Sequence, residues 1–147
     1  MIADTNSIIG SYLVRCVTLT SLIGGWAAPR LYCPRLPENA VLPALGFFTR
    51  GGSSTPYIPG IVTPSVQFDC WGNTPIEARQ VYRALYDNLQ GISMWDSIIY
   101  VLPPIGFFPP YPILSAIEEV QGQDLVDVEI PNYFRVLTFF SIMIRAV

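Results

Sequence analysis

The residues that could do chemistry in this chain are mainly carboxylates near its end. Glu118 and Glu119 are followed by Asp124, Asp127 and Glu129, which together could imitate a catalytic carboxylate pair or a calcium loop. A calcium loop places its oxygen ligands at fixed positions around an invariant glycine, and the spacing here does not match that pattern. We therefore expect a solvated turn between strands at these residues.

Other common active-site groups are missing from the composition. The 147 residues include no histidine and no lysine, so all eight positive charges are arginines. Ser-His-Asp and Cys-His sites need histidine, and a phosphate-binding loop needs lysine. Cys16, Cys33 and Cys70 are widely spaced and too few to form a tetrahedral zinc site. We expect reduced, partly buried thiols, no metal, no cofactor and no enzymatic activity.

The low charge content points to extensive contact with partners. Apolar residues make up 51% of the chain and charged residues 13%, against about 25% charged in typical domains. Obligate subunits and membrane proteins both show this pattern. The longest uncharged run, residues 97–117, contains five prolines, and clustered prolines prevent a continuous membrane-spanning helix. The N-terminus also has no basic signal-peptide region. We expect a soluble, intracellular protein without a membrane segment.

The acidic balance argues against nucleic-acid binding. The net charge is −3, and the arginines are scattered along the sequence. Neutralising phosphates requires clustered cations, which this chain does not have. Any DNA that meets this protein is expected to pass it without specific binding.

Residues 66–89 predict a strand, a polar turn and a capped amphipathic helix. Thr74 suits the cap, Pro75 the first helical position, and Glu77 the acidic position of a capping box. Asp69 is expected to face solvent or to cap the turn at Asn73, with a perturbed acid as the alternative. Apolar residues follow at helical spacing: Ala78, Val81, Tyr82, Leu85 and Leu89. This module covers a sheet and carries no catalytic group, which favours a structural or assembly role.

The remaining elements complete one domain over residues 1–147. We expect a first helix over residues 4–23, which Gly24 and Gly25 end. A long loop is expected from Gly51 to about Pro64. Strands are expected at residues 30–35, 44–50, 66–71, 98–102, 113–120 and 133–144, with a turn at residues 121–124.

The final predicted strand is apolar on both faces, as a strand covered on both sides should be. One face carries Phe134, Val136, Phe140, Ile142 and Ile144, which can pack on helices. The opposite face carries Leu137, Phe139 and Met143, for which the simplest cover is a neighbouring subunit.

Two further sets of residues are candidate contacts with partners. Arg79 and Arg83 lie one helical turn apart and could touch a partner, with an ordinary helix pair of Arg83 with Asp87 as the alternative. The proline-rich segment 91–112 is predicted to be an arm for a neighbouring subunit, with a loop packed on its own domain as the alternative. Its aromatic residues are Trp95, Phe107, Phe108 and Tyr111.

Three segments resemble the tail-terminator, or tail-completion, proteins of long-tailed bacteriophages. They are RLYCPRLPENAVLPALGFF, with its two Leu-Pro pairs, VQFDCWGNTPIEARQVYRALYDNL, and the closing strand FRVLTFFSIMI. The Asp-Cys-Trp before Thr-x-x-Glu-Ala is the most specific part. The resemblance covers about two-thirds of the chain, and residues 91–112 do not align with it.

The resemblance implies an α+β fold with a small antiparallel sheet of about four strands and two helices packed on it. It implies a homo-oligomer, a hexameric ring in the phage neck that assembles in the host cytoplasm. Such a ring ends tail-tube growth and joins the tail-tube protein to the head connector, while DNA passes through its lumen. A connector or stopper ring subunit is the alternative function, and an enzyme or small-ligand module is a more remote one.

Overall fold

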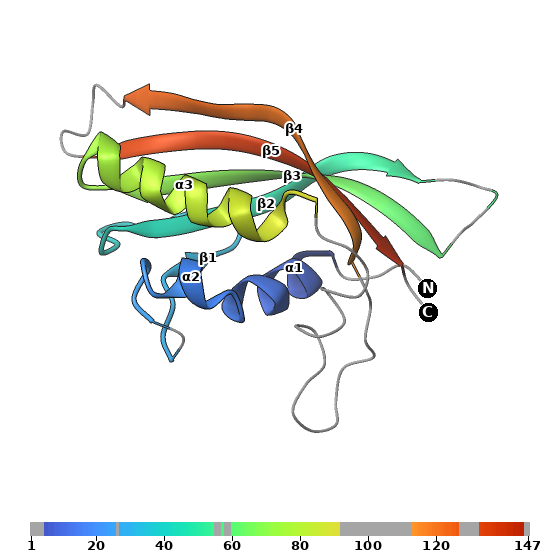
Figure 1. Ribbon diagram of the computed structural model, residues 1–147, viewed down its shortest axis with the longest axis horizontal. Helices are drawn as coiled ribbons and strands as arrows, with labels where there is room; N and C mark the ends of the chain where they lie inside the picture. The colour runs from blue at the N-terminus through green and yellow to red at the C-terminus, as the bar shows by residue number, and fades with distance from the viewer. Residues whose placement is uncertain are drawn as a thin grey trace.

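The computed structural model describes residues 5–25, 27–54, 57, 60–91, 113–126 and 133–145. It is an α+β fold in which helices cover one face of a five-stranded sheet (Figure 1). The elements are α1 (Thr5–Val14), α2 (Val17–Thr20), β1 (Leu31–Tyr32), β2 (Ala44–Ser54), β3 (Ile61–Gly72), α3 (Pro75–Leu89), β4 (Ile113–Val126) and β5 (Phe134–Arg145).

The sheet has the strand order β1-β2-β3-β5-β4. β2, β3, β5 and β4 pair antiparallel in that order, which confirms the predicted four-stranded core of the sheet. The short β1 pairs parallel with β2 at Leu45 and Gly46, so the complete sheet is mixed. β5 follows β4 in the chain, yet it lies between β3 and β4.

Alternation along the strands divides the sheet into a covered face and a helix-free face. On β5, Val136, Thr138, Phe140, Ile142 and Ile144 are at most 1% exposed, whereas the residues between them are partly exposed. The covered face packs against α1, α2 and α3 in one continuous core. The predicted two-faced character of the last strand is therefore confirmed.

The helix α3 forms as its sequence predicts. The backbone N–H of Glu77 donates to the Thr74 hydroxyl at 3.1 Å, and Pro75 occupies the first turn. The apolar positions predicted for its inner face are all buried: Ala78, Val81, Tyr82, Leu85 and Leu89. The cap and the amphipathic spacing both predicted a helix at these residues. α3 packs against β3, β5 and β4.

The single first helix expected over residues 4–23 is wrong. The structure divides the segment into α1 and α2, because Cys16 has an extended backbone, with φ −77° and ψ 93°. The β-branched residues Val17, Thr18 and Thr20 follow this break, and such side chains favour helices weakly. Both helices nevertheless bury the predicted face, including Ile9, Leu13 and Leu19.

The long loop expected from Gly51 to Pro64 is also wrong. β2 continues to Ser54 and β3 begins at Ile61, so much of this stretch is paired strand. A register shift between Thr49 and Gly52 accommodates the glycines, and both have positive φ, 111° at Gly51 and 134° at Gly52. The ends of β2 and β3 extend past α3 (Figure 1).

The turn expected at residues 121–124 is replaced by strand. β4 continues through it to Val126, with register shifts on either side of Val120. β-bulges let a strand absorb extra residues without ending. Glu118, Glu119 and Asp124 therefore lie on a strand, not in a solvated turn. The expected strand at residues 98–102 and the proline-rich segment 91–112 lie outside the described residues, except for Gly91.

Among the described residues, no helix is long and apolar enough to cross a membrane.

Candidate functional site

The helix-free face of the sheet is the candidate functional site. Because directly paired residues of antiparallel strands point to the same face, the register assigns its members. We define the helix-free face by Phe48 and Arg50 of β2, Gln67, Asp69 and Trp71 of β3, Arg135, Leu137, Phe139 and Met143 of β5, and Val120 of β4. Except for Asp69, these side chains are partly or fully exposed in the isolated chain.

Two arginines lie over aromatic rings on this face. The Arg50 guanidinium carbon is 3.9 Å from the Phe139 ring centroid, and that of Arg135 is 5.2 Å from the Trp71 centroid. Arg50 Nε also donates to the Ser65 hydroxyl at 3.4 Å. Arginine and tryptophan are enriched among the residues that contribute most to protein–protein binding.

Asp69 is a buried acid on this face, and its residue exposure is 7%. Arg135 Nη1 lies 3.7 Å from Asp69 Oδ1, and the Gln67 amide donates to the carboxylate at 3.4 Å. Burial raises the pKa of Asp69 above its usual 3.8, although Arg135 and Gln67 oppose that shift. The expectation that Asp69 faces solvent or caps the turn is wrong, because its strand position places it beside Leu137.

The structure brings together only part of the predicted contact set. Leu137, Phe139 and Met143 share the helix-free face, as predicted. Arg79 and Arg83 lie on α3, on the other side of the sheet. Arg79 forms an ion pair with Asp124 of β4, with 2.9 Å between Arg79 Nε and Asp124 Oδ1. Arg83 is exposed. Trp95, Phe107, Phe108 and Tyr111 lie outside the described residues.

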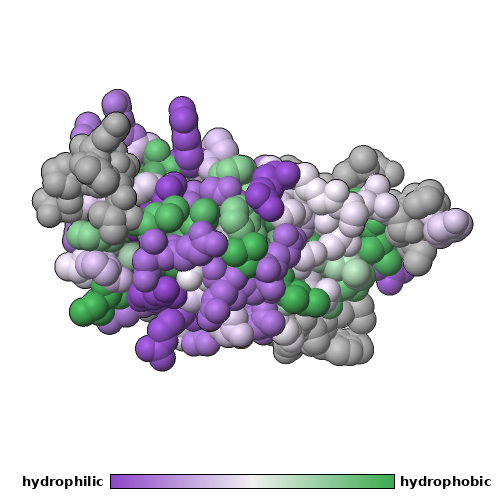
Figure 2. Space-filling view, turned by 90° about the horizontal axis from the view of Figure 1, so that it is seen from above, coloured by the Kyte–Doolittle hydropathy of each residue, from purple (hydrophilic) through white to green (hydrophobic). Residues whose placement is uncertain are grey.

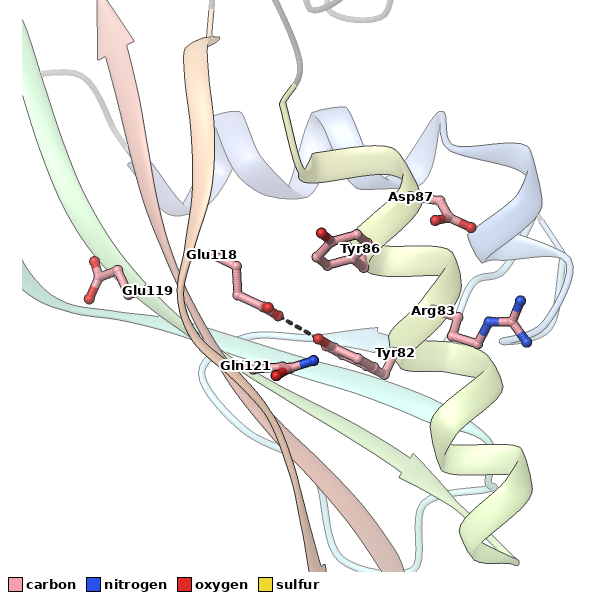
Figure 3. A pocket seen from close by; sticks show the side chains of 7 residues that line it. All are labelled: Tyr82, Arg83, Tyr86, Asp87, Glu118, Glu119 and Gln121. Atoms are coloured by element: carbon pink, nitrogen blue, oxygen red, sulfur yellow. Dashed lines mark hydrogen bonds between the residues drawn. The ribbon is translucent and has the colours of Figure 1, made fainter.

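A polar contact joins α3 to β4 beside an open hollow (Figure 3). Tyr82 donates to Glu118 Oε2 at 2.6 Å, and Thr138 of β5 donates to the same oxygen at 2.8 Å. Burial and the Glu118 contact raise the pKa of Tyr82 to about 12. In the close view, Arg83 and Asp87 point away from β4, so the hollow does not gather its charged groups toward one point.

Hydrophilic residues predominate on the side of the molecule that carries the β4 edge. Seen from that edge, they occupy the middle of the surface, and hydrophobic residues appear only in small groups between them (Figure 2). This side therefore differs from the helix-free face, where aromatic and aliphatic side chains are neighbours across β2, β3 and β5.

Two of the three cysteines lie in the core of the described chain. Cys16 and Cys70 are free thiols in the buried core, and Cys33 is exposed. Burial raises the pKa of Cys16 to about 12 and raises that of Cys70 as well, so these two thiols stay protonated and unreactive at neutral pH. Among the described residues, no three His, Cys, Asp or Glu side chains are close enough to hold a metal ion.

Sequence reasoning missed the contacts that join distant parts of the chain. The contacts of Arg50 with Phe139 and of Asp69 with Arg135 are two examples. They depend on the register between strands, which cannot be deduced from the sequence. The signal for Asp69 was its position: it alternates with Phe68 and Cys70, so it had to lie on the same face as Trp71.

The sequence matches no known protein-family model. Comparison with curated proteins also gives no match.

Proposed function

We propose that this chain is a structural subunit of a ring, of the kind that tail-terminator proteins form between the tail tube and head of long-tailed phages. The observation that carries the proposal is the helix-free face. An antiparallel sheet exposed to water on one side normally alternates apolar and polar residues cleanly. Here the exposed side keeps Phe48, Trp71, Leu137, Phe139 and Met143, which favours a protein cover.

The dimensions of the face suit a stable interface. β5 has 12 residues, which at about 3.3 Å per residue extends roughly 40 Å. Four long strands spaced about 4.8 Å apart are roughly 19 Å wide. The resulting area of roughly 760 Å² is close to the ~800 Å² that each partner buries in a standard interface. A second copy is therefore a sufficient cover for the helix-free face.

A closed ring requires the face to meet a different surface of the next copy. Contacts between unlike surfaces generate rings when the rotation closes, whereas contacts between identical surfaces stop at a dimer. The resemblance to tail terminators supports the ring, and its segments lie on β1 and β2, on β3 with α3, and on β5. We propose a hexamer on that basis.

In the proposed role, the ring ends tube growth and offers its other side to the head connector. DNA passes through the lumen without specific binding. The net charge of −3 supports this role, because a wall that carries net negative charge does not retain DNA. The site of action is then the phage neck, after assembly in the host cytoplasm.

Light scattering and negative-stain microscopy of the purified chain test the proposal together. A ring predicts a mass of about six subunits and particles with a central hole, either alone or after addition of tail-tube protein. Tubes assembled with the chain present should also stop growing at a defined end. A monomer at every concentration, with no effect on tube length, would contradict the proposed function.

A further inference from the structure

β4 forms one of the two edges of the described sheet. β4 pairs only with β5 among the described strands, and it is 14 residues long. A long edge strand presents free N–H and C=O groups that another strand can pair with. Such an edge recruits strands from other molecules unless the protein protects it.

The end of α3 caps the first part of this edge. The Gln90 side-chain oxygen accepts a hydrogen bond from the backbone N–H of Glu118 at 2.8 Å. The Gly91 N–H donates to the Ala116 carbonyl at 3.0 Å. One outward donor and one outward acceptor of β4 are thereby already used.

Side chains from the middle of α3 cap the next part. The Tyr82 hydroxyl accepts from the Gly122 N–H at 3.2 Å, and Arg79 Nη2 donates to the Gly122 carbonyl at 3.4 Å. The Tyr82 ring lies so close that a Cβ on Gly122 would be 2.7 Å from it. A larger residue at position 122 would displace the ring, so glycine lets Tyr82 reach the backbone.

We propose that Arg79, Tyr82 and Gln90, here called the edge guards, block the outer edge of β4. Without them, the β4 edge of a second copy would pair with this edge by strand addition. The same edge in a second copy carries matching outward groups at the positions that the edge guards occupy: an acceptor at Gly122, and donors at Glu118 and Gly122. Two such edges pair around a two-fold axis. The inference goes beyond the proposed ring, because it concerns a contact that the helix-free face does not use.

The test compares two variants that carry the same three changes of residue type on α3 or at its C-terminal end. The guard variant is Arg79→Ala, Tyr82→Phe, Gln90→Ala. The matched control is Arg83→Ala, Tyr86→Phe, Gln80→Ala, three side chains that make no hydrogen bond to the β4 backbone in the described part of the chain. Both are made in a Phe139→Asp background, which disables the helix-free face, so failure of the proposed function does not affect the result.

Sedimentation and hydrogen exchange are measured over a concentration series. The guard variant should shift from monomer to dimer mass as concentration rises, while the control stays monomeric. Its amides at Glu118 and Gly122 should exchange fast when dilute and become protected when concentrated. Dimerisation should increase with added salt, because Glu118, Glu119 and Asp124 of the two copies come close together.

A folded guard variant that stays monomeric would overturn the proposal. If the guard variant does not fold, the single change Gln90→Ala tests the proposal instead. Gln90 is exposed and follows α3, so its truncation should leave the core intact. This change frees the Glu118 N–H and should produce dimers, while Gln90→Glu keeps the accepting oxygen and should not. Equal behaviour of the Ala and Glu variants would also overturn the proposal.

Discussion

Burial of the Asp69 side chain makes the stability of the fold depend on pH. Its folded-state pKa lies above 3.8 because burial outweighs Arg135 and Gln67. The folded state therefore holds this proton to a higher pH than the unfolded state does. The free energy of unfolding attributable to Asp69 falls as pH rises from about 3.8 through the raised pKa.

Asp69→Asn should therefore stabilise the protein at neutral pH relative to the wild type. The advantage should shrink toward zero as pH falls to about 3, where Asp69 is protonated in both states. Urea unfolding of both proteins across this pH range measures the difference in their free energies of unfolding. A variant that is less stable than the wild type at neutral pH would mean that the Arg135 contact outweighs the burial cost.

Substitutions at Thr74 and Leu85 compare the stability that the helix cap contributes with the stability that core burial contributes in α3. Thr74→Ala removes a cap and should cost about 1 kcal/mol of unfolding free energy. Leu85→Ala removes a fully buried side chain and should cost roughly 2–5 kcal/mol. Chemical denaturation of the two variants gives the comparison directly. Equal, small effects would show that the inner face of α3 is not part of the core.

At the scale of elements, the β2–β3 hairpin depends on two glycines with different surroundings. Both have positive φ, but a Cβ on Gly51 meets nothing within 4 Å, whereas one on Gly52 would be 2.3 Å from the Thr63 carbonyl oxygen. Gly51 is therefore a matched control for backbone strain alone, and Gly52 adds a steric clash with β3.

Gly51→Ala should destabilise the protein by about 1–2 kcal/mol, the cost of a side chain in a left-handed conformation. Gly52→Ala should cost about 1–3 kcal/mol more, because β3 must move to admit the methyl group. Thermal or urea unfolding measures both, and hydrogen exchange at Thr63 and Ser65 locates the change. Identical losses in the two variants would contradict the clash.

The sequence predicted best the elements whose signals are local. Thr74, Pro75 and the helical spacing of Val81 and Leu85 lie within one segment, and α3 forms as expected. The boundaries of β2, β3 and β4 were wrong because pairing overrides turn composition. Gly51 and Gly122 resemble loop residues, yet each sits in a strand, next to a bulge or under an aromatic ring.

The candidate site was predictable only in part for the same reason. Period-two alternation identified Leu137, Phe139 and Met143 as an outward face of β5. It did not show that Arg50 and Phe48 of β2 share that face, because the register between β2, β3 and β5 is not a local property. Arg79 was a candidate contact with a partner, with an ordinary surface role as the alternative, and the sequence did not indicate that it pairs with Asp124 of its own chain.

At the scale of the whole molecule, the helix-free face should control assembly. Phe139→Asp or Met143→Asp places a charge in the proposed interface, where it would be buried without a partner. We expect either change to abolish ring formation while the monomer stays folded, since both side chains are partly exposed. Light scattering gives the mass, and circular dichroism checks the fold.

Ile76→Asp is the matched control for these variants. Ile76 is an apolar side chain that is 73% exposed on α3, away from the helix-free face. An acid in the first turn of a helix is also favourable. Rings should form normally in this variant, and their loss would place the second surface of the ring contact at the start of α3. Normal rings from Phe139→Asp and Met143→Asp as well would exclude β5 from the subunit contact.

The position of β5 between β3 and β4 has a consequence for biosynthesis. A ribosome makes β4 before β5, but among the described strands β4 has β5 as its sole neighbour. While β5 is still inside the exit tunnel, β1, β2, β3 and α3 can associate, whereas β4 has no strand to join. Emergence of β5 adds a strand beside β3, and β4 can then pair with the other edge of β5 and complete the core. A nascent chain therefore cannot display a finished helix-free face, and contacts through this face can form only after β5 has left the ribosome.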